Sequence, residues 1–143
     1  MYNVAIITAS DKGYAGERED MSGQVNEDIA LAKGLQVASK IILPDDRRIL
    51  ADEMIALCDQ EIDLILTTGG TGFSKRDVTP EATADVVERR ADNLTFAMIA
   101  NSLQYTPKAM LSRGIAGIRG NTLIVNLPGS PKAVRENLEY AID

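Results

Sequence analysis

The chain has 143 residues, of which 45% are hydrophobic, so we expect one globular domain over residues 1–143 that buries a sizeable core. Its formal net charge is −6 and no run of Lys or Arg forms a stripe, which argues against nucleic acid as the main partner. The sequence has no histidine and one cysteine, which excludes His-assisted nucleophilic triads, His-ligated zinc and internal disulfides.

Three short apolar runs rich in β-branched residues predict buried strands over residues 2–9, 39–44 and 63–68. Apolar residues at helical spacing between these runs predict helices within residues 21–34 and 45–60. Asp20 or Ser22 can cap the first helix, and Gly34 can follow its end. The order β-α-β-α-β predicts a parallel sheet.

The second half of the chain predicts two further helices over residues 80–91 and 93–106. Residues 114–128 contain two apolar runs that meet near Gly120 and Asn121, which is typical of a β-hairpin, and residues 131–143 predict a closing helix. We therefore expect an α/β fold of three layers, α/β/α, with a mostly parallel central sheet and a short β-hairpin near the C-terminus.

The chain enters its first apolar strand at once, without a basic leader segment. No segment approaches the roughly 18 apolar residues that a membrane span needs. We therefore expect a cytoplasmic protein with no membrane partner.

Polar or glycine-rich segments follow four of the predicted strands. They are residues 10–11, 44–46, 69–72 and 126–130. Ligands of open parallel sheets bind in the crevice beyond the carboxyl ends of the strands. We therefore expect the functional residues at this edge of the sheet.

The glycine run at residues 69–72 allows positive φ angles and an anion-binding nest of N–H groups, although a purely structural turn explains the glycines equally well. Its spacing fits neither a Walker A loop nor a dinucleotide fingerprint. The continuation adds Lys75 and Arg76, and Thr79 and Pro80 predict the N-cap and first residue of a helix. A helix N-terminus beside a glycine nest and two cations favours a phosphate site.

A second helix start follows at Ser130, which is placed as N-cap with Pro131 as first helical residue. Lys132 lies in the first turn of this helix, where its positive charge is unfavourable with respect to the helix dipole unless an anion is nearby. The lysine can indicate such an anion, but a solvated surface lysine explains its presence equally well.

Asp45 and Asp46 both precede a predicted helix, and only one of them is needed as its cap. The other carboxylate and Asp77 can hold Mg²⁺ at neighbouring strand ends, which would also relieve their repulsion of a polyphosphate.

Two features remain without a functional assignment. Cys58 lies on the apolar stripe of its helix and is expected in the core rather than as a reactive thiol. Residues 12–20 form a long connection that is either a mobile flap or a solvated loop.

Residues 64–83, LILTTGGTGFSKRDVTPEAT, closely resemble the signature of the molybdenum cofactor biosynthesis domain shared by MogA and MoaB proteins. The resemblance continues in residues 9–23, 43–46 and 106–137, and so covers nearly the whole chain. Thr71 and the Arg76-Asp77 continuation resemble the adenylyltransferase branch rather than the molybdate insertases or the competence/damage-inducible proteins of the same fold.

The resemblance implies an enzyme that joins AMP from Mg-ATP to the terminal phosphate of molybdopterin and releases pyrophosphate. It implies Asp45 and Asp77 as the catalytic carboxylates and magnesium ligands. It implies substrate binding by Gly69, Gly70, Thr71, Gly72, Ser74, Ser102, Asn126, Pro128 and Gly129, and binding of the adenylate side by Ser10 and Asp11.

The resemblance also implies a homotrimer or homohexamer, with a molybdate insertase as a possible partner. Two other functions remain open at this stage. One is a carrier that binds molybdopterin without catalysis, and the other is a nucleotide pyrophosphate hydrolase of the same fold.

Overall fold

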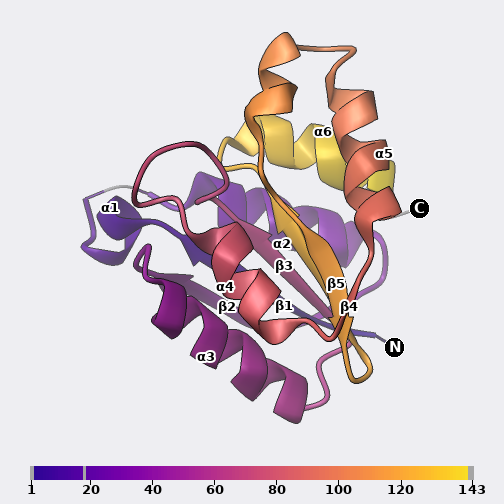
Figure 1. Ribbon diagram of the computed structural model, residues 1–143. Coiled ribbons are helices and arrows are strands. Elements are labelled where there is room, and N and C mark those ends of the chain that lie inside the picture. The colour runs from indigo at the N-terminus through magenta and orange to yellow at the C-terminus, as the bar shows by residue number, and fades with distance from the viewer. Residues whose placement is uncertain (1, 18, 142–143) are drawn as a thin grey trace.

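A six-stranded sheet in the order β2-β1-β3-β6-β5-β4 forms the centre of the fold (Figure 1). The computed structural model describes residues 2–17 and 19–141. The strands are β1 (Asn3–Ala9), β2 (Gln36–Leu43), β3 (Leu64–Thr68), β4 (Arg89–Arg90), β5 (Ala116–Arg119) and β6 (Thr122–Leu127). The first four strands in spatial order run parallel, and β5 pairs antiparallel with both β6 and β4. The expected α/β class, mostly parallel sheet and C-terminal hairpin are confirmed.

Helices cover both faces of the sheet and complete the three layers. They are α1 (Asp11–Tyr14), α2 (Met21–Ala32), α3 (Arg47–Asp59), α4 (Thr79–Val86), α5 (Asp92–Ser102), the 3-10 helix η1 (Pro107–Leu111) and α6 (Pro131–Ala141). α3 and α4 pack on one face, while α2, α5 and α6 pack on the other. The last two residues of the helix predicted over 131–143 lie outside the described residues.

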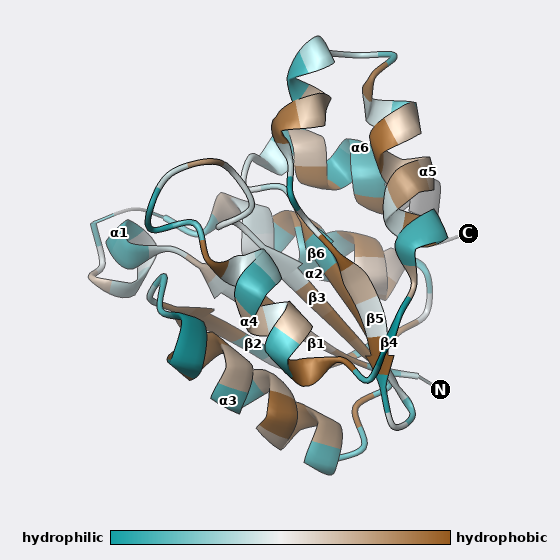
Figure 2. Cartoon of the chain, in the orientation of Figure 1, coloured by the Kyte–Doolittle hydropathy of each residue, from teal (hydrophilic) through white to brown (hydrophobic). Residues whose placement is uncertain are grey.

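The alternation of side chains along β1 explains why both faces need a helical layer. Ala5 and Ile7 point into the cluster with α3 and α4, whereas Val4 and Ile6 point into the cluster with α2 and α6. All four are fully buried. A strand buried on both faces has to be apolar throughout, and the central strands are correspondingly hydrophobic in Figure 2.

Several helix ends follow the expected chemistry. Asp20, Asp46 and Ser130 each accept a hydrogen bond from a backbone N–H in the first turn of α2, α3 and α6, respectively. Gly34 has φ +80° just after the end of α2, as a residue that follows a helix often does.

The start of α4 differs from the expectation. Thr79 is the first residue of this helix rather than its cap, and the preceding Val78 makes no side-chain capping bond. The Thr79 hydroxyl is buried and has no hydrogen-bond partner in the described part of the chain. The backbone N–H of Thr79 instead donates to the carbonyl of Gly70, which draws the helix start against the glycine turn.

The helix predicted over residues 80–91 is shorter than expected. α4 ends at Val86, and Val87 is extended. The N–H groups of Glu88 and Ala91 then donate to carbonyls of β5, so Arg89 and Arg90 add a sixth strand to the sheet edge. Pairing with an open strand edge therefore overrides the local helical preference of this segment.

The extent of β2 and the burial of Cys58 also differ from the expectation. β2 begins at Gln36, before the predicted start at Ser39, and alternates between exposed and partly buried side chains because it is an edge strand. Cys58, expected in the core, is only partly buried against the cluster under α3, and burial raises the pKa of its thiol.

α5 and η1 project beyond the sheet in Figure 1. Only Met98 and Ser102 of α5 are buried, although the helix is apolar on most sides. Within the described residues, no helix combines the length and apolar character required to cross a bilayer.

Candidate functional site

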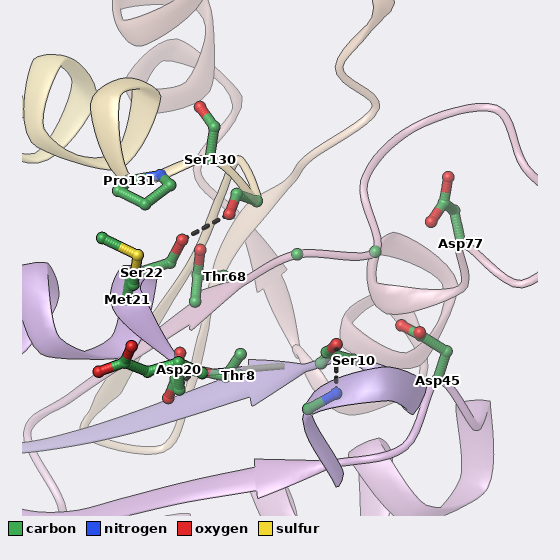
Figure 3. Close-up of a pocket in the computed structure, with 16 residues that line it drawn as sticks. Thr8, Ser10, Asp20, Met21, Ser22, Asp45, Thr68, Asp77, Ser130 and Pro131 are labelled. Atoms are coloured by element: carbon green, nitrogen blue, oxygen red, sulfur yellow. Dashed lines mark hydrogen bonds between the residues drawn. The ribbon is translucent and has the colours of Figure 1, made fainter. Parts of the chain in front are cut away.

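A pocket of about 530 Å³ opens beyond the carboxyl ends of the parallel strands (Figure 3). Residues 8–10 at the end of β1 and 68–70 after β3 form its floor. The start of α2 and the turn at residues 129–131 form one wall, and Asp45 and Asp77 lie on the opposite side of the pocket. The pocket therefore lies where an open parallel α/β sheet places its ligands.

The glycine turn after β3 requires glycine at two positions. Gly69 and Gly70 have φ angles of +88° and +70°. A Cβ at Gly69 would lie 2.5 Å from the carbonyl oxygen of Ala9, and one at Gly70 would lie 2.3 Å from the Thr79 hydroxyl. The N–H groups of Gly70 and Thr71 have no acceptor in the described part of the chain. The turn therefore has the geometry of an anion-binding nest.

Asp45 is held in place by Asp11. The N–H of Asp11 donates to Oδ2 of Asp45 at 3.1 Å, and the N–H of Asp45 donates to Oδ1 of Asp11 at 3.0 Å. Oδ1 of Asp45 is buried and has no hydrogen-bond partner among the described residues. Burial, with repulsion from Asp11 and Asp77, raises the pKa of the Asp45 carboxyl.

Arg76 forms an ion pair with Asp11 and does not line the pocket. Its guanidinium donates two hydrogen bonds to the Asp11 carboxylate, at 2.9 and 2.8 Å. These bonds hold the pKa of the Asp11 carboxyl below its usual range. The carboxylate oxygens of Asp11 are thereby engaged by Arg76 and by the backbone of Asp45.

Asp77 comes from the loop between β3 and α4. Its Oδ2 accepts a hydrogen bond from the N–H of Ser74 at 3.0 Å, and its own N–H donates to the Ser74 carbonyl. Its carboxylate faces the pocket on the same side as that of Asp45 (Figure 3).

The opposite wall consists of polar groups that are bonded to one another. Asp20 accepts hydrogen bonds from the Thr8 hydroxyl and from the N–H of Gly23, at 2.9 and 2.8 Å. The Ser22 hydroxyl donates to the carbonyl of Gly129 at 2.5 Å, which ties the start of α2 to the turn before α6. Two helix N-termini therefore border the pocket on this side.

The charge of the pocket is negative. Among the described residues, its lining contains four carboxylates and no Lys or Arg. Lys75 and Arg76, which were expected to neutralise a phosphate, are exposed and do not line it. Lys132 in the first turn of α6 is exposed as well.

The structure brings together six of the thirteen residues to which the family resemblance assigns a site role. Ser10, Asp45, Gly69, Gly70, Asp77 and Gly129 line the pocket. The other seven lie outside its lining: Asp11, Thr71, Gly72, Ser74, Ser102, Asn126 and Pro128. All of the assigned roles remain predictions.

Ser102 and Asn126 are buried, and their side chains form hydrogen bonds with other residues of the protein. The Ser102 hydroxyl donates to Oδ1 of Asn137 at 2.9 Å. The Asn126 amide donates to the hydroxyls of Thr67 and Thr83, both at 2.9 Å, and its Oδ1 accepts the N–H of Ile115 at 3.0 Å. Both side chains therefore link elements of the fold.

Sequence reasoning missed part of the pocket. Thr8 and Met21 line it, and Asp20 and Ser22 had been considered only as possible caps. The signal was present, since α2 begins beyond the end of β1 and its first turn must meet the same edge of the sheet. Arg113, which binds the loop that carries Asp77, gave no local signal.

Comparisons with known proteins agree with this geometry. Residues 5–143 match the family model described as "Probable molybdopterin binding domain". The chain is 40% identical over 141 residues to the molybdopterin adenylyltransferase of Helicobacter pylori strain J99, which covers 96% of this chain and 80% of that protein. It is 36% identical over 144 residues to the molybdopterin adenylyltransferase of Escherichia coli K12, which covers 98% of this chain and 73% of that protein.

A solved structure is similar over the same extent. The molybdopterin biosynthesis enzyme MoaB from Thermus thermophilus superposes with a TM-score of 0.93 at 44% identity, covering 99% of this chain and 90% of that one. The family model, which matches residues 5–143, spans the pocket and both aspartates. The chain therefore belongs to the family of MogA/MoaB-type molybdopterin-binding domains, as the motif of residues 64–83 indicated.

Proposed function

We propose that this protein transfers AMP from Mg-ATP to molybdopterin and releases pyrophosphate. The observation that carries the proposal is the meeting of Asp45 and Asp77 in one pocket beside the Gly69-Gly70 turn. Similarity to molybdopterin adenylyltransferases over 96% of the chain supports the choice of substrate.

The reaction suits a chain without histidine. An oxygen of the terminal phosphate of the pterin attacks the α-phosphorus of ATP, and a new P–O bond forms. The bond from the α-phosphorus to the bridging oxygen breaks, and its electron pair leaves with pyrophosphate. No proton has to be removed from an ionised phosphate, so catalysis rests on positioning and charge neutralisation.

The negative pocket indicates where the neutralising charge comes from. ATP and the pterin phosphate are anions, and the described lining offers carboxylates but no Lys or Arg. Oδ1 of Asp45 is a buried acceptor without a partner in the described chain, and Asp77 faces the same pocket. Mg²⁺ commonly binds through one or two carboxylates together with substrate phosphates and water, so these residues fit it. When bound, it would offset the charge that develops on the phosphates.

The chain's own groups would orient the two phosphates. The free N–H groups of Gly70 and Thr71 can hold phosphate oxygens at the glycine turn. The N-terminus of α6 at Ser130 and Pro131 offers a second site of positive potential on the opposite wall. The roles inferred from the family resemblance for Ser10, Pro128 and Gly129 belong to this same proposal.

The test is to mix the protein with molybdopterin and Mg-ATP under anaerobic conditions, and to measure adenylylated pterin by chromatography and pyrophosphate by a coupled assay. We expect product only when all components are present, and none when EDTA removes the metal. Tight pterin binding without product would indicate a carrier instead. Pyrophosphate release in the absence of pterin would indicate a hydrolase.

We also propose that the protein is a homo-oligomer, expected to be a trimer or hexamer. The support is an apolar surface on and after α5, where Phe96, Tyr105 and Met110 are 73%, 61% and 65% exposed. Large apolar side chains that are exposed together commonly mark a protein interface. Light scattering coupled to size-exclusion chromatography measures the mass, and a monomer that persists at assay concentration would contradict the proposal. A cytoplasmic location and contact with a molybdate insertase remain predictions.

A further inference from the structure

Arg113 binds both ends of the loop that carries Asp77. Its backbone N–H donates to the carbonyl of Thr71 at 2.8 Å. Its guanidinium donates from Nε to the carbonyl of Gly72 at 2.8 Å and from Nη2 to the carbonyl of Asp77 at 2.7 Å. A single residue, 36 positions after Asp77, thus fixes where the loop leaves β3 and where it enters α4.

Glu81 fixes the orientation of that guanidinium. Nη1 of Arg113 donates to Oε2 of Glu81 at 2.5 Å, and this contact holds the pKa of the Glu81 carboxyl below its usual range. The arginine fork therefore has a carboxylate on one edge and two loop carbonyls on the others. Lysine, with a single nitrogen on a flexible stem, cannot reproduce this arrangement.

The rest of the loop has little other support. Residues 73–76 are exposed, and Phe73 at 70% exposure packs little against the protein. Within the loop, Ser74 and Asp77 exchange two hydrogen bonds, and outside it Arg76 pairs with Asp11 on the surface. Exposed ion pairs of this kind contribute little to stability. The placement of Asp77 on the same side of the pocket as Asp45 therefore depends on the inner contacts.

We propose that Arg113 is a positioning residue that holds the Asp77 carboxylate in the geometry required for transfer. Arg113 does not line the pocket, so it acts through the loop rather than on substrate. The inference rests on the proposed function for its effect on the reaction, but its effect on the loop can be measured without any substrate.

The first experiment measures loop order in the apoprotein. The chain contains no Trp, so Phe73→Trp introduces a single indole at an exposed site of the loop. In this background we expect Arg113→Ala and Arg113→Lys each to lower the steady-state anisotropy of the indole. Arg47→Ala is the matched control, because Arg47 also binds a carboxylate through two nitrogens, but that carboxylate belongs to Asp85 near the C-terminal end of α4 and not to the loop. An unchanged anisotropy in folded Arg113 variants would overturn the proposal.

The second experiment separates positioning from general stability. We expect Arg113→Ala and Arg113→Lys to lower kcat by about 10-fold or more with less than about a 3-fold change in KM for ATP, as befits a misplaced catalytic group. If Arg113 acts through Asp77, the same change in an Asp77→Asn background lowers kcat by less than about 2-fold, because coupled residues are not additive. Fully multiplicative losses would show that Arg113 does not act through Asp77.

Each variant is first tested for folding by circular dichroism and thermal melting. If Arg113→Ala does not fold, Arg113→Lys keeps the charge and one hydrogen bond and serves in both experiments. If the wild-type protein forms no adenylylated pterin, the proposed function fails, whereas the anisotropy comparison still decides whether Arg113 orders the loop.

Discussion

Asp11 and Asp45 each accept a hydrogen bond from the other's backbone N–H, at 3.0 and 3.1 Å. This exchange joins the ends of β1 and β2 and uses one oxygen of Asp45. The other oxygen of Asp45 remains buried and unpartnered in the described structure, beside the pocket. A buried acceptor without a partner destabilises the empty protein. The same oxygen can coordinate a cation when one is bound.

Asp45→Asn should therefore stabilise the empty protein at neutral pH while abolishing transfer. Burial raises the pKa of this carboxyl above its ordinary value of 3.8, so ionisation favours the unfolded chain. The stabilising contribution of the protonated form is complete below pH 3.8 and is lost as the pH rises through the raised pKa. The melting temperature of the variant should exceed that of wild type at pH 7, with a smaller difference at pH 4. A variant that is less stable than wild type at pH 7 would contradict this account of Asp45.

Asp77→Asn should leave the protein folded and lower transfer by at least about 100-fold, a loss of several kcal/mol of transition-state stabilisation. The amide oxygen can still accept the N–H of Ser74, so the loop keeps its internal hydrogen bond. The measurement is kcat for adenylylated pterin at saturating Mg-ATP.

Asp85→Asn is the control for that change. Asp85 is an exposed aspartate on α4 that pairs with Arg47 and does not line the pocket. Its replacement should change kcat by less than about 2-fold, because surface ion pairs have little effect on structure. Turnover by Asp77→Asn at the rate of Asp85→Asn would remove Asp77 from the mechanism.

Gly70→Ala should destabilise the protein more than Gly34→Ala. Both glycines have positive φ, +70° and +80°, which costs an alanine about 1–2 kcal/mol at either position. A Cβ at Gly34 meets nothing within 4 Å, whereas one at Gly70 would lie 2.3 Å from the Thr79 hydroxyl. That overlap should add about 1–3 kcal/mol to the loss in free energy of unfolding, which is measured by urea unfolding. Equal losses in the two variants would show that Thr79 moves aside without strain.

The parallel sheet and the pocket edge could be predicted because their signals are local. The apolar run of β1 and the glycines at 69 and 70 each identify their own conformation, and strand order then brings Asp45 and Asp77 to one edge. The strand at Arg89 and Arg90 was missed because its pairing with β5 depends on an edge that forms elsewhere in the chain.

The contacts of Arg113 could not be predicted for a related reason. Its guanidinium binds carbonyls 36 and 41 residues earlier, and neither a carbonyl nor a distant arginine leaves a pattern in the sequence. Polar residues present a similar difficulty. The amide of Asn126 has the same chemistry whether it meets a ligand or, as here, Thr67, Thr83 and Ile115.

Asn126→Ala should lower the free energy of unfolding by about 2–4 kcal/mol, because it leaves the N–H of Ile115 without its acceptor in a buried site and removes two further hydrogen bonds. Ser102→Ala removes one hydrogen bond, to Asn137, and should cost about 1 kcal/mol. Urea unfolding at constant m-value measures both losses.

A second measurement decides whether Asn126 is only a structural link or also contacts the pterin. It is the KM for molybdopterin of the folded Asn126→Ala protein, determined well below its melting temperature. A KM within about 2-fold of wild type would leave Asn126 as a structural link between β6, β3 and α4, whereas a rise of about 10-fold, or about 1.4 kcal/mol, would show that its amide also contacts the pterin. A stability loss below about 1 kcal/mol would contradict the structural account, because three buried hydrogen bonds cannot be removed at so small a cost without rearrangement.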